Sequence, residues 1–363
     1  MTAQGRIVVA LGTRPEIIKL APIIKLLGRR ARVVHTGQHY DAGLSNVFFS
    51  AFDLPEPDVQ LEIGGTTRAS QIGETTQRVG EHLLSDPADA MVVQGDTNTT
   101  LGAALAANAN EIPVIHIEAG LRSFDRAMPE EHNRVLTDML SDLCCAPTKV
   151  SEQNLLDSAV PASRIVVTGN TIVEALQALL PAERAGLLEA HNLTAGQFVL
   201  ATFHRPENVD DPENLAAILE QLANIPLPVV FPMHPRTEER IAGFGLSELL
   251  TGIQTVKPVG YEEFLGLSAE CSFLISDSGG IQEEASILKR PVLVVRRSTE
   301  RPEVLGTFAE RVLPGPEIGR VARGWIDDLS ALHHKLADLP SPYGDGTAAE
   351  KSVAAINRLL GGG

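Results

Sequence analysis

The feature that most constrains the fold is an alternation of short apolar runs with amphipathic stretches, which occurs twice along the chain. Each apolar run has the length of a buried β-strand, and each amphipathic stretch has apolar residues at helical spacing. The predicted strands cover residues 6–11, 31–36, 90–94, 113–118 and 164–169, and then 198–203, 228–233, 272–276 and 291–295. The predicted helices include 99–109, 131–144, 213–223, 281–288 and 319–337. This alternation predicts two doubly wound α/β domains with parallel sheets.

The length and the less periodic middle segment agree with two domains. A domain typically has about 150 residues, so a chain of 363 residues is long enough for two separate cores. The alternation is interrupted near residues 170–195, which is where we expect the boundary. A glycine-rich turn and a further helix are predicted at the C-terminal end of the chain.

Composition excludes several classes of function. The formal net charge is −16, from 30 Lys and Arg against 46 Asp and Glu, and aromatic residues are only 4 %. A nucleic-acid partner is therefore not expected, because cations to displace counterions and rings to stack on bases are both scarce. No apolar run approaches the ~20 residues of a membrane-spanning helix, so membrane insertion is not expected either. The three cysteines suit no redox motif and predict a reducing, cytoplasmic location.

Polar side chains follow the predicted strands directly. In open parallel sheets the carboxyl ends of the strands line the ligand crevice. Any one such residue is more often a turn residue or a surface ion pair, but seven together favour a ligand site in a central cleft between the two domains. The seven residues are Arg14, Asp96, Glu118, His204, His234, Ser278 and Arg301.

The sequence SDSGG (276–280) is the strongest single signal of a bound phosphate. A strand leads into Ser278, Gly279 and Gly280, and a helix is predicted to begin there. Two glycines allow backbone N–H groups to approach a phosphate, and the helix dipole favours negative charge at that point. Glu284, about one turn further on, is placed to accept hydrogen bonds from ribose. The alternative is a glycine-rich turn with Glu284 in solvent.

No cofactor or metal ion is expected from the motifs. The glycine spacing matches neither a dinucleotide-binding fingerprint nor a Walker loop. Zinc-type spacings of His and Cys are also missing from the sequence. A phosphate leaving group would therefore be stabilised by Arg, His and backbone amides.

The motifs together resemble those of the non-hydrolysing UDP-N-acetylglucosamine 2-epimerases. In order along the chain, they are GTRPEIIKLAP (12–22), TGQH (36–39), QGDTNTT (94–100), HIEAGLRS (116–123), PEEHNR (129–134), TGNT (168–171), HRPEN (204–208), SDSGGIQEEA (276–285), ERPE (300–303) and PYGDG (342–346). Their common order over residues 12–346 is far more specific than any one of them.

The resemblance implies an architecture and a reaction. The expected fold is α/β of GT-B type, with two Rossmann-like doubly wound domains facing a central cleft and a final helix that returns to the first domain. Residues 1–170 plus 344–363 would carry the sugar-side catalytic groups, and residues 171–343 would bind UDP. The implied reaction inverts C2 of UDP-N-acetylglucosamine through elimination of UDP, a 2-acetamidoglucal intermediate and re-addition of UDP.

The same resemblance implies roles for individual residues. Asp96, Glu118 and Glu130 match the catalytic carboxylates and His204 matches the catalytic histidine, although Glu130 is also explained by the preference for acidic residues at a helix start. Which carboxylate removes the proton and which returns it stays open. Phe264 would pack near uracil, and Glu284 would hold the ribose. The remaining substrate-binding residues are Arg14, Lys19, Arg205, His234, Ser278, Gly279, Gly280 and Arg301.

Three departures from the family pattern argue against allosteric activation by substrate, although Gln38 and Arg205 are retained, and one of them is that Arg68 matches an arginine of the activated members only approximately. Pro206 stands where many members have an arginine, and Asp41 stands where activated members have glutamine. The alternative functions are a hydrolysing epimerase that releases UDP and free N-acetylmannosamine, an epimerase of a related UDP-acetamido sugar and, less favoured, a GT-B glycosyltransferase. The three carboxylates favour an epimerase, because simple glycosyl transfer has no use for all of them. The expected partners are a UDP-sugar and a second copy of the chain in a homodimer.

Overall fold

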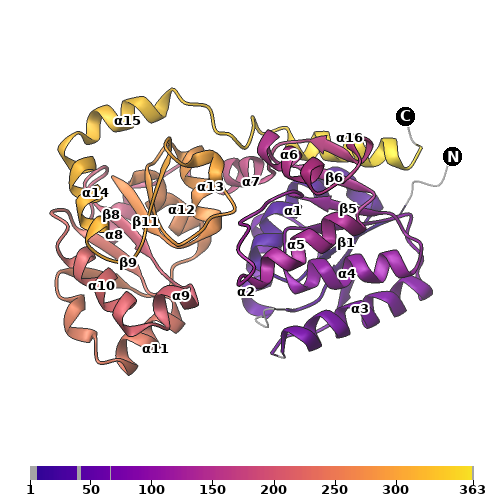
Figure 1. Ribbon diagram of the computed structural model, residues 1–363, viewed down its shortest axis with the longest axis horizontal. Coiled ribbons are helices and arrows are strands. Elements are labelled where there is room, and N and C mark those ends of the chain that lie inside the picture. The colour runs from indigo at the N-terminus through magenta and orange to yellow at the C-terminus, as the bar shows by residue number, and fades with distance from the viewer. Residues whose placement is uncertain (1–5, 39–41, 66, 362–363) are drawn as a thin grey trace. The chain divides into compact units, whose positions relative to one another are not determined.

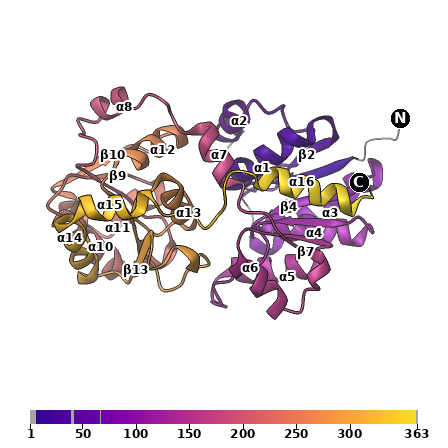
Figure 2. The same cartoon turned by 90° about the horizontal axis from the view of Figure 1, so that it is seen from above.

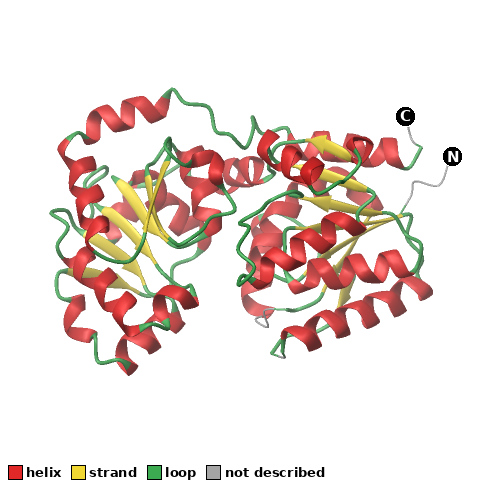
Figure 3. Ribbon diagram, viewed as in Figure 1, coloured by secondary structure: helices red, strands yellow, loops and turns green. Residues whose placement is uncertain are grey.

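The computed structural model describes residues 6–38, 42–65 and 67–361, which form two compact units (Figure 1). The first unit comprises Met1–Ala178 and Tyr343–Gly363, and the second comprises Leu179–Pro342. Each is a parallel sheet with helices between its strands, as the sequence predicts (Figure 3). The sequence predicted these divisions between residues 170 and 171 and between residues 343 and 344. The cleft between the two domains stays a prediction. His39 of TGQH and Asp41 lie outside the described residues.

The described part of the first unit contains one sheet of seven strands in the order β3-β2-β1-β4-β5-β6-β7. Its strands are β1 Ile7–Leu11, β2 Ala31–His35, β3 Val59–Gln60, β4 Ala90–Gln94, β5 Val114–Ile117, β6 Leu143–Ala146 and β7 Ile165–Val167. In β1, Val9 lies opposite both Val33 and Val92. Helices cover both faces of such a sheet, which explains why every residue of β1, β4 and β5 is buried and why most of them are apolar.

Small residues allow the helices of this unit to pack closely. The helices are α1 Arg14–Leu27, α2 Ala42–Ala51, α3 Arg68–Ser85, α4 Asn98–Ala109, α5 Pro129–Leu140, α6 Lys149–Asp157, α7 Ile172–Leu179 and α16 Ala348–Leu359. At Gly102 of α4, an added Cβ would lie 2.8 Å from Cγ2 of Thr75 in α3. The C-terminal helix α16 packs against α1 and β6 of the same unit (Figure 2).

The described part of the second unit contains a sheet of six strands in the order β10-β9-β8-β11-β12-β13. Its strands are β8 Val199–Thr202, β9 Val229–Pro232, β10 Ile253–Val256, β11 Phe273–Ser276, β12 Val292–Val295 and β13 Ala309–Val312. Its helices are α8 Ala185–Ala190, α9 Pro206–Val209, α10 Pro212–Ala223, α11 Pro235–Gly243, α12 Tyr261–Glu270, α13 Gly279–Leu288, α14 Pro316–Asp327 and α15 Leu329–Ala337. Aromatic rings fill the core, where Phe273 meets Trp325 edge to face at a centroid distance of 5.4 Å.

The structure corrects two of the predicted helices. The helix expected over 131–144 ends at Leu140, because the run LCCA that follows is the buried strand β6. The helix expected over 319–337 is two helices, α14 and α15, which meet at Asp328. The strands β3, β6, β10 and β13 were not predicted. Among the described residues, no helix is long and apolar enough to cross a membrane.

A buried histidine at the end of β2 gives the first unit a pH-dependent stability. His35 is 2 % exposed, and its Nδ1 accepts a hydrogen bond from the backbone N–H of Gly37 at 3.1 Å. Burial lowers the pKa of His35 from 6.5 to about 4. In the unfolded chain the imidazole of His35 therefore binds a proton below about pH 6.5, whereas in the folded chain it binds one only near pH 4.

We expect the free energy of unfolding to fall between pH 6.5 and pH 4 by up to about 3 kcal/mol on account of His35. Above pH 6.5 the imidazole is neutral in both states, so this contribution is fully present there. Denaturant titrations of wild type and His35→Asn over this range measure the effect, because Asn has no titrating group. Equal slopes for the two proteins would contradict the assignment to His35.

Candidate active site

Three neighbouring strands of the first sheet end in residues that the sequence singled out. Arg14 follows β1, Asp96 follows β4 and Glu118 follows β5, and these strands are adjacent in the sheet. The carboxyl ends of parallel strands meet at one edge, so this arrangement follows from the topology. Arg14 is exposed at the start of α1, and it makes no hydrogen bond or ion pair with any residue that the structure describes.

Glu118 forms a buried ion pair with Lys19. The Nζ atom of Lys19 lies 2.7 Å from Oε1 and 2.6 Å from Oε2 of Glu118, and both residues are 5 % exposed. The side-chain amide of Gln94 donates to Oε2 as well. Glu118 also has a φ of +67°, a backbone conformation that favours glycine. Such strain is most often kept at functional sites. Lys19 is buried in this ion pair and does not lie on a solvated face of α1.

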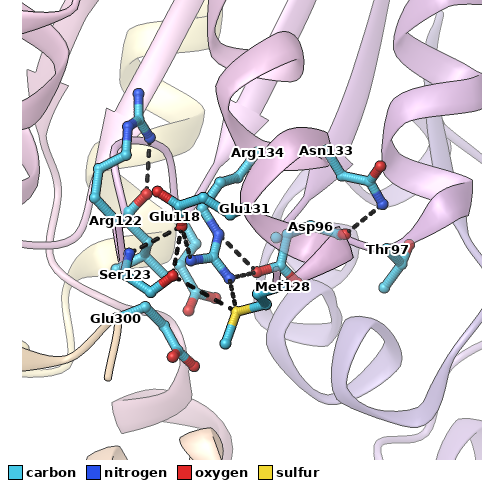
Figure 4. Close-up of polar contacts among 12 residues, drawn as sticks. Asp96, Thr97, Glu118, Arg122, Ser123, Met128, Glu131, Asn133, Arg134 and Glu300 are labelled. Atoms are coloured by element: carbon cyan, nitrogen blue, oxygen red, sulfur yellow. Dashed lines mark hydrogen bonds and ion pairs between the residues drawn. The ribbon is translucent and has the colours of Figure 1, made fainter. Parts of the chain in front are cut away.

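Asp96 is held by two side chains of α5, those of Arg134 and Asn133 (Figure 4). Its Oδ2 accepts from Nε of Arg134 at 3.0 Å and also from Nη2 of that residue, and its backbone carbonyl accepts from Nδ2 of Asn133 at 2.9 Å. The side chain is 27 % exposed. Within the described part of the chain, no group donates to Oδ1. This oxygen is therefore available to exchange a proton with a ligand.

The two glutamates at the start of α5 have different environments. Glu131 is 6 % exposed and accepts from the backbone N–H groups of Ser123 at 2.9 Å and Phe124 at 3.0 Å. Glu130 is exposed and has no hydrogen bond or ion pair to the described residues. The carboxylate of Glu131 therefore holds the loop before α5, whereas that of Glu130 is free to meet a ligand.

A second buried glutamate, which the sequence reasoning missed, ties two strand ends together. Glu16 is 1 % exposed and accepts from the N–H of Gly12 at 2.9 Å, from Thr13 at 2.8 Å and from Thr97 at 2.8 Å. Burial raises the pKa of Glu16, although these hydrogen bonds oppose the shift. The loop that carries Arg14 is thus fixed to the loop that carries Asp96.

In the second unit, Asp277 organises the histidine and arginine that follow β8. Its Oδ1 lies 3.2 Å from Nδ1 of His204, and its Oδ2 accepts from the backbone N–H of Arg205 at 3.0 Å. Burial by itself would raise the pKa of Asp277, but its hydrogen bonds to His204, Arg205 and Asn208 outweigh burial and lower this pKa. The side chain of His204 is 41 % exposed, so its Nε2 edge is left for a ligand.

The glycines that follow β11 lie at the start of α13, as the sequence predicts. Ser278 is the N-cap residue of this ten-residue helix, which begins at Gly279. A Cβ added to Gly279 would lie 2.5 Å from Oε1 of Glu300, whereas a Cβ added to Gly280 would have nothing closer than 3.9 Å. A side chain at Gly279 would displace the buried Glu300, whereas Gly280 leaves open space at a helix terminus that favours anions.

Glu284 and Phe264 lie on neighbouring helices of this unit. Glu284 is 7 % exposed and accepts from the hydroxyl of Tyr261 at 2.7 Å. Burial raises the pKa of Tyr261 well above its usual value, and the adjacent Glu284 adds to this shift. Phe264 is half-buried one turn further along α12. This arrangement contradicts the alternative of a solvated Glu284.

Arg301 is buried in a cluster of ion pairs, whereas His234 is exposed. Arg301 is 7 % exposed, and its Nε lies 2.7 Å from Oε1 of Glu283, while Nη1 contacts Glu300. His234 is exposed as the N-cap of α11, and its Nδ1 accepts from the backbone N–H of Arg236 at 3.2 Å. Its ring centroid is 5.8 Å from that of His204.

The predicted site residues are divided between the two units. Arg14, Lys19, Asp96, Glu118 and Glu130 lie in the first unit, and the other nine predicted site residues lie in the second. The sequence reasoning missed the residues that hold them, although Glu131, Arg134 and Asp277 lie inside the quoted motifs. Among the described residues, no group of three or more His, Cys, Asp and Glu side chains could bind a metal ion.

Comparison with known proteins gives a consistent result over nearly the whole chain. A family model described as UDP-N-acetylglucosamine 2-epimerase matches residues 27–357. The UDP-N-acetylglucosamine 2-epimerase of Methanocaldococcus jannaschii is 41 % identical over 362 residues, covering 96 % of this chain and 98 % of that protein. The UDP-2,3-diacetamido-2,3-dideoxy-D-glucuronate 2-epimerase of Pseudomonas aeruginosa is 37 % identical, with 98 % and 100 % covered.

A solved structure agrees with the sequence matches. The crystal structure of the M. jannaschii UDP-GlcNAc 2-epimerase in complex with UDP-GlcNAc and UDP superimposes with a TM-score of 0.86 at 38 % identity. The match covers 97 % of this chain and 99 % of that chain. The motifs, the two parallel sheets and these matches agree, and the chain belongs to the UDP-N-acetylglucosamine 2-epimerase family.

Proposed function

We propose that this protein reversibly epimerises UDP-N-acetylglucosamine at C2 to UDP-N-acetylmannosamine without net hydrolysis. The observation that carries the proposal is that Asp96 and Glu118 follow adjacent strands of the first unit, and that α5, which holds Asp96, begins with Glu130. Inversion at C2 needs proton exchange on opposite faces of the sugar, and carboxyl groups are suited to that task. No described residue donates a hydrogen bond to Oδ1 of Asp96 or to the carboxylate of Glu130, so both can meet a ligand.

The proposed chemistry begins with loss of UDP. A carboxylate takes the proton from C2, and the C2–H electrons form a C1=C2 double bond. The bond between C1 and the phosphate oxygen breaks, and UDP leaves with its electron pair. The resulting 2-acetamidoglucal then receives a proton at C2 on the opposite face, and UDP adds back to C1. No oxidant or co-reactant is needed, because the proton and UDP are both returned.

The second unit is proposed to hold UDP throughout. The diphosphate would lie against Ser278, Gly279 and Gly280 at the start of α13, where the helix dipole favours an anion. Arg205 and His204, oriented by Asp277, would neutralise the charge that develops on the leaving phosphate. Glu284 would accept from the ribose hydroxyls, and Phe264 would pack near uracil.

The other substrate-binding roles follow from position and charge. Arg14 is exposed at the start of α1 and would contact the sugar and the diphosphate. Lys19 would act through its ion pair with Glu118. The guanidinium of Arg301 lies next to Gly279, so its positive charge would attract a diphosphate bound on the other side of this glycine. His234 would pack beside the ring of His204.

Two alternatives keep the same carboxylates and differ in outcome. A hydrolysing epimerase would let water capture the sugar after UDP departs, and free N-acetylmannosamine would be released. An epimerase of another UDP-acetamido sugar is the second alternative, since the P. aeruginosa relative is named for a diacetamido-glucuronate substrate. A glycosyltransferase is less favoured, because it has no use for all three carboxylates.

Incubation with UDP-N-acetylglucosamine in D₂O tests the proposal. We expect proton NMR to show UDP-N-acetylmannosamine and one solvent deuterium at C2 in both epimers, because the proton is exchanged through a protein carboxylate. Free N-acetylmannosamine with equimolar UDP would indicate hydrolysis instead. Exchange with UDP-2,3-diacetamido-glucuronate alone would indicate the other sugar, and no exchange with either would contradict the epimerase proposal.

We further propose that the protein is a cytoplasmic homodimer. The exposed apolar side chains of Leu136 and Met139 on α5 are 51 % and 52 % exposed, which favours a partner on that face. Cys144, Cys145 and Cys271 are buried free thiols, as expected in a reducing compartment. A monomer mass in sedimentation velocity would contradict the dimer, and fractionation of source cells tests the location.

A further inference from the structure

Arg134 of α5 is a buried cation in direct contact with a proposed catalytic carboxylate (Figure 4). Only 3 % of its side chain is exposed. Its Nε lies 3.0 Å from Oδ2 of Asp96, and its Nη2 contacts the same oxygen. Its Nη1 lies 2.8 Å from Oε2 of Glu131. The guanidinium therefore bridges Asp96 to a second carboxylate.

The second carboxylate is itself fixed to the backbone. Oε2 of Glu131 accepts from the N–H of Ser123 at 2.9 Å and from its hydroxyl at 2.8 Å, and Oε1 accepts from the N–H of Phe124 at 3.0 Å. Because Glu131 cannot turn without losing these bonds, it holds Arg134 in one orientation. The rigid fork of donors on Arg134 then determines where Oδ2 of Asp96 lies.

The same helix also holds the main chain of Asp96. Asn133, the neighbour of Arg134, donates from Nδ2 to the carbonyl oxygen of Asp96 at 2.9 Å. The backbone and one carboxylate oxygen of Asp96 are thus both fixed by α5. The other oxygen, Oδ1, is the one that no described group contacts, and the side chain is 27 % exposed.

We propose that Arg134 is a positioning residue for proton transfer at C2, because by holding Oδ2 it presents Oδ1 of Asp96 to the substrate. The inference rests on the proposed epimerase function and adds a residue to it. A lysine at this position would keep the charge but lose the two donors that grip one oxygen. Misplacing a reacting group by about 1 Å can lower a rate on the order of 10²-fold.

The substitution Arg134→Lys separates positioning from binding. We expect kcat for epimerisation to fall by about 10- to 100-fold, with the KM for UDP-N-acetylglucosamine and the Kd for UDP changed by no more than about twofold. The matched control is Arg184→Lys in the second unit. Arg184 pairs with Glu270 at 2.6 Å and takes no part in the site, so its variant should keep the wild-type kcat.

Chemical rescue is a second measurement, because added guanidinium would not restore activity if Arg134 had only a structural role. In Arg134→Ala, added guanidinium should raise kcat in a saturable way, whereas Asp96→Asn should show no rescue. If Arg134→Ala does not fold, the lysine variant decides the question. A kcat for Arg134→Lys equal to that of Arg184→Lys, parallel losses of kcat and UDP affinity, or a folded alanine variant without rescue would each overturn the inference. A wild-type protein that exchanges no deuterium would instead overturn the proposed function, and this inference with it.

Discussion

Asp96→Asn is expected to lower kcat for epimerisation by about 10³- to 10⁴-fold, near the upper range for loss of a general acid–base group. Asparagine has the same shape as aspartate, and its amide oxygen can still accept from Arg134. The amide NH₂ then occupies the place of Oδ1, which no described group contacts in the wild type. An NH₂ group cannot take a proton from C2, so turnover is lost while the surroundings remain in place.

Binding of UDP is the control for this variant. We expect the Kd for UDP, measured by calorimetry, to stay within about twofold of wild type, because UDP is proposed to be held by the second unit. Deuterium uptake at C2 should fall in parallel with kcat. Lost UDP affinity with unchanged deuterium exchange would contradict the roles assigned to the two units.

Glu118→Gln should differ from Asp96→Asn in its effect on stability. Glu118 pairs with Lys19 through both oxygens, and both residues are buried. Removing one partner of such a pair typically costs about 3–5 kcal/mol, because the other charge is left buried. The glutamine variant should therefore lose turnover together with part of its unfolding free energy, although its remaining carbonyl oxygen limits the cost.

The sequence predicts the central strands better than the edge strands, for a physical reason. Central strands of parallel sheets are buried on both faces, so β1, β4, β8 and β11 are apolar along all or nearly all of their length. The unpredicted strands β3, β10 and β13 are edges, and part of each is exposed. Polar residues therefore interrupt their pattern. The fourth unpredicted strand, β6, is internal. It begins only two residues after α5 ends, so its first apolar residues were included in the predicted helix over 131–144.

The candidate site divides in a similar way. Residues directly after strands, such as Asp96 and Glu118, are predictable because topology brings strand ends together. The residues that hold them are fixed by tertiary contacts. Arg134 meets Asp96 across 38 positions of sequence and Asp277 meets His204 across 73, and no local pattern encodes such pairs. Spacing within one helix or strand predicts which of its residues lie on the same face. It does not predict which charged side chain of another element they will contact.

Gly279 and Gly280 are expected to respond differently to the same small substitution, and the contrast tests the proposed diphosphate site. A Cβ at Gly279 would lie 2.5 Å from Oε1 of Glu300 and 3.0 Å from Nη1 of Arg301. Both neighbours are buried in an ion-paired cluster, so they cannot move away easily. Gly279→Ala should therefore lower the unfolding free energy by about 1–3 kcal/mol, as overpacking usually does.

Gly280→Ala has room for its methyl group, because the nearest neighbour of the added Cβ would be Oε1 of Glu284 at 3.9 Å. Alanine is favoured over glycine in a helix by about 0.5–1 kcal/mol, so the melting temperature should stay the same or rise. If the diphosphate lies against this backbone, the methyl group displaces it, and the Kd for UDP should rise at least about tenfold, or 1.4 kcal/mol. Wild-type UDP affinity in a stable Gly280→Ala protein would place the diphosphate elsewhere, whereas weak binding with unchanged stability requires an anion in the space that this glycine leaves.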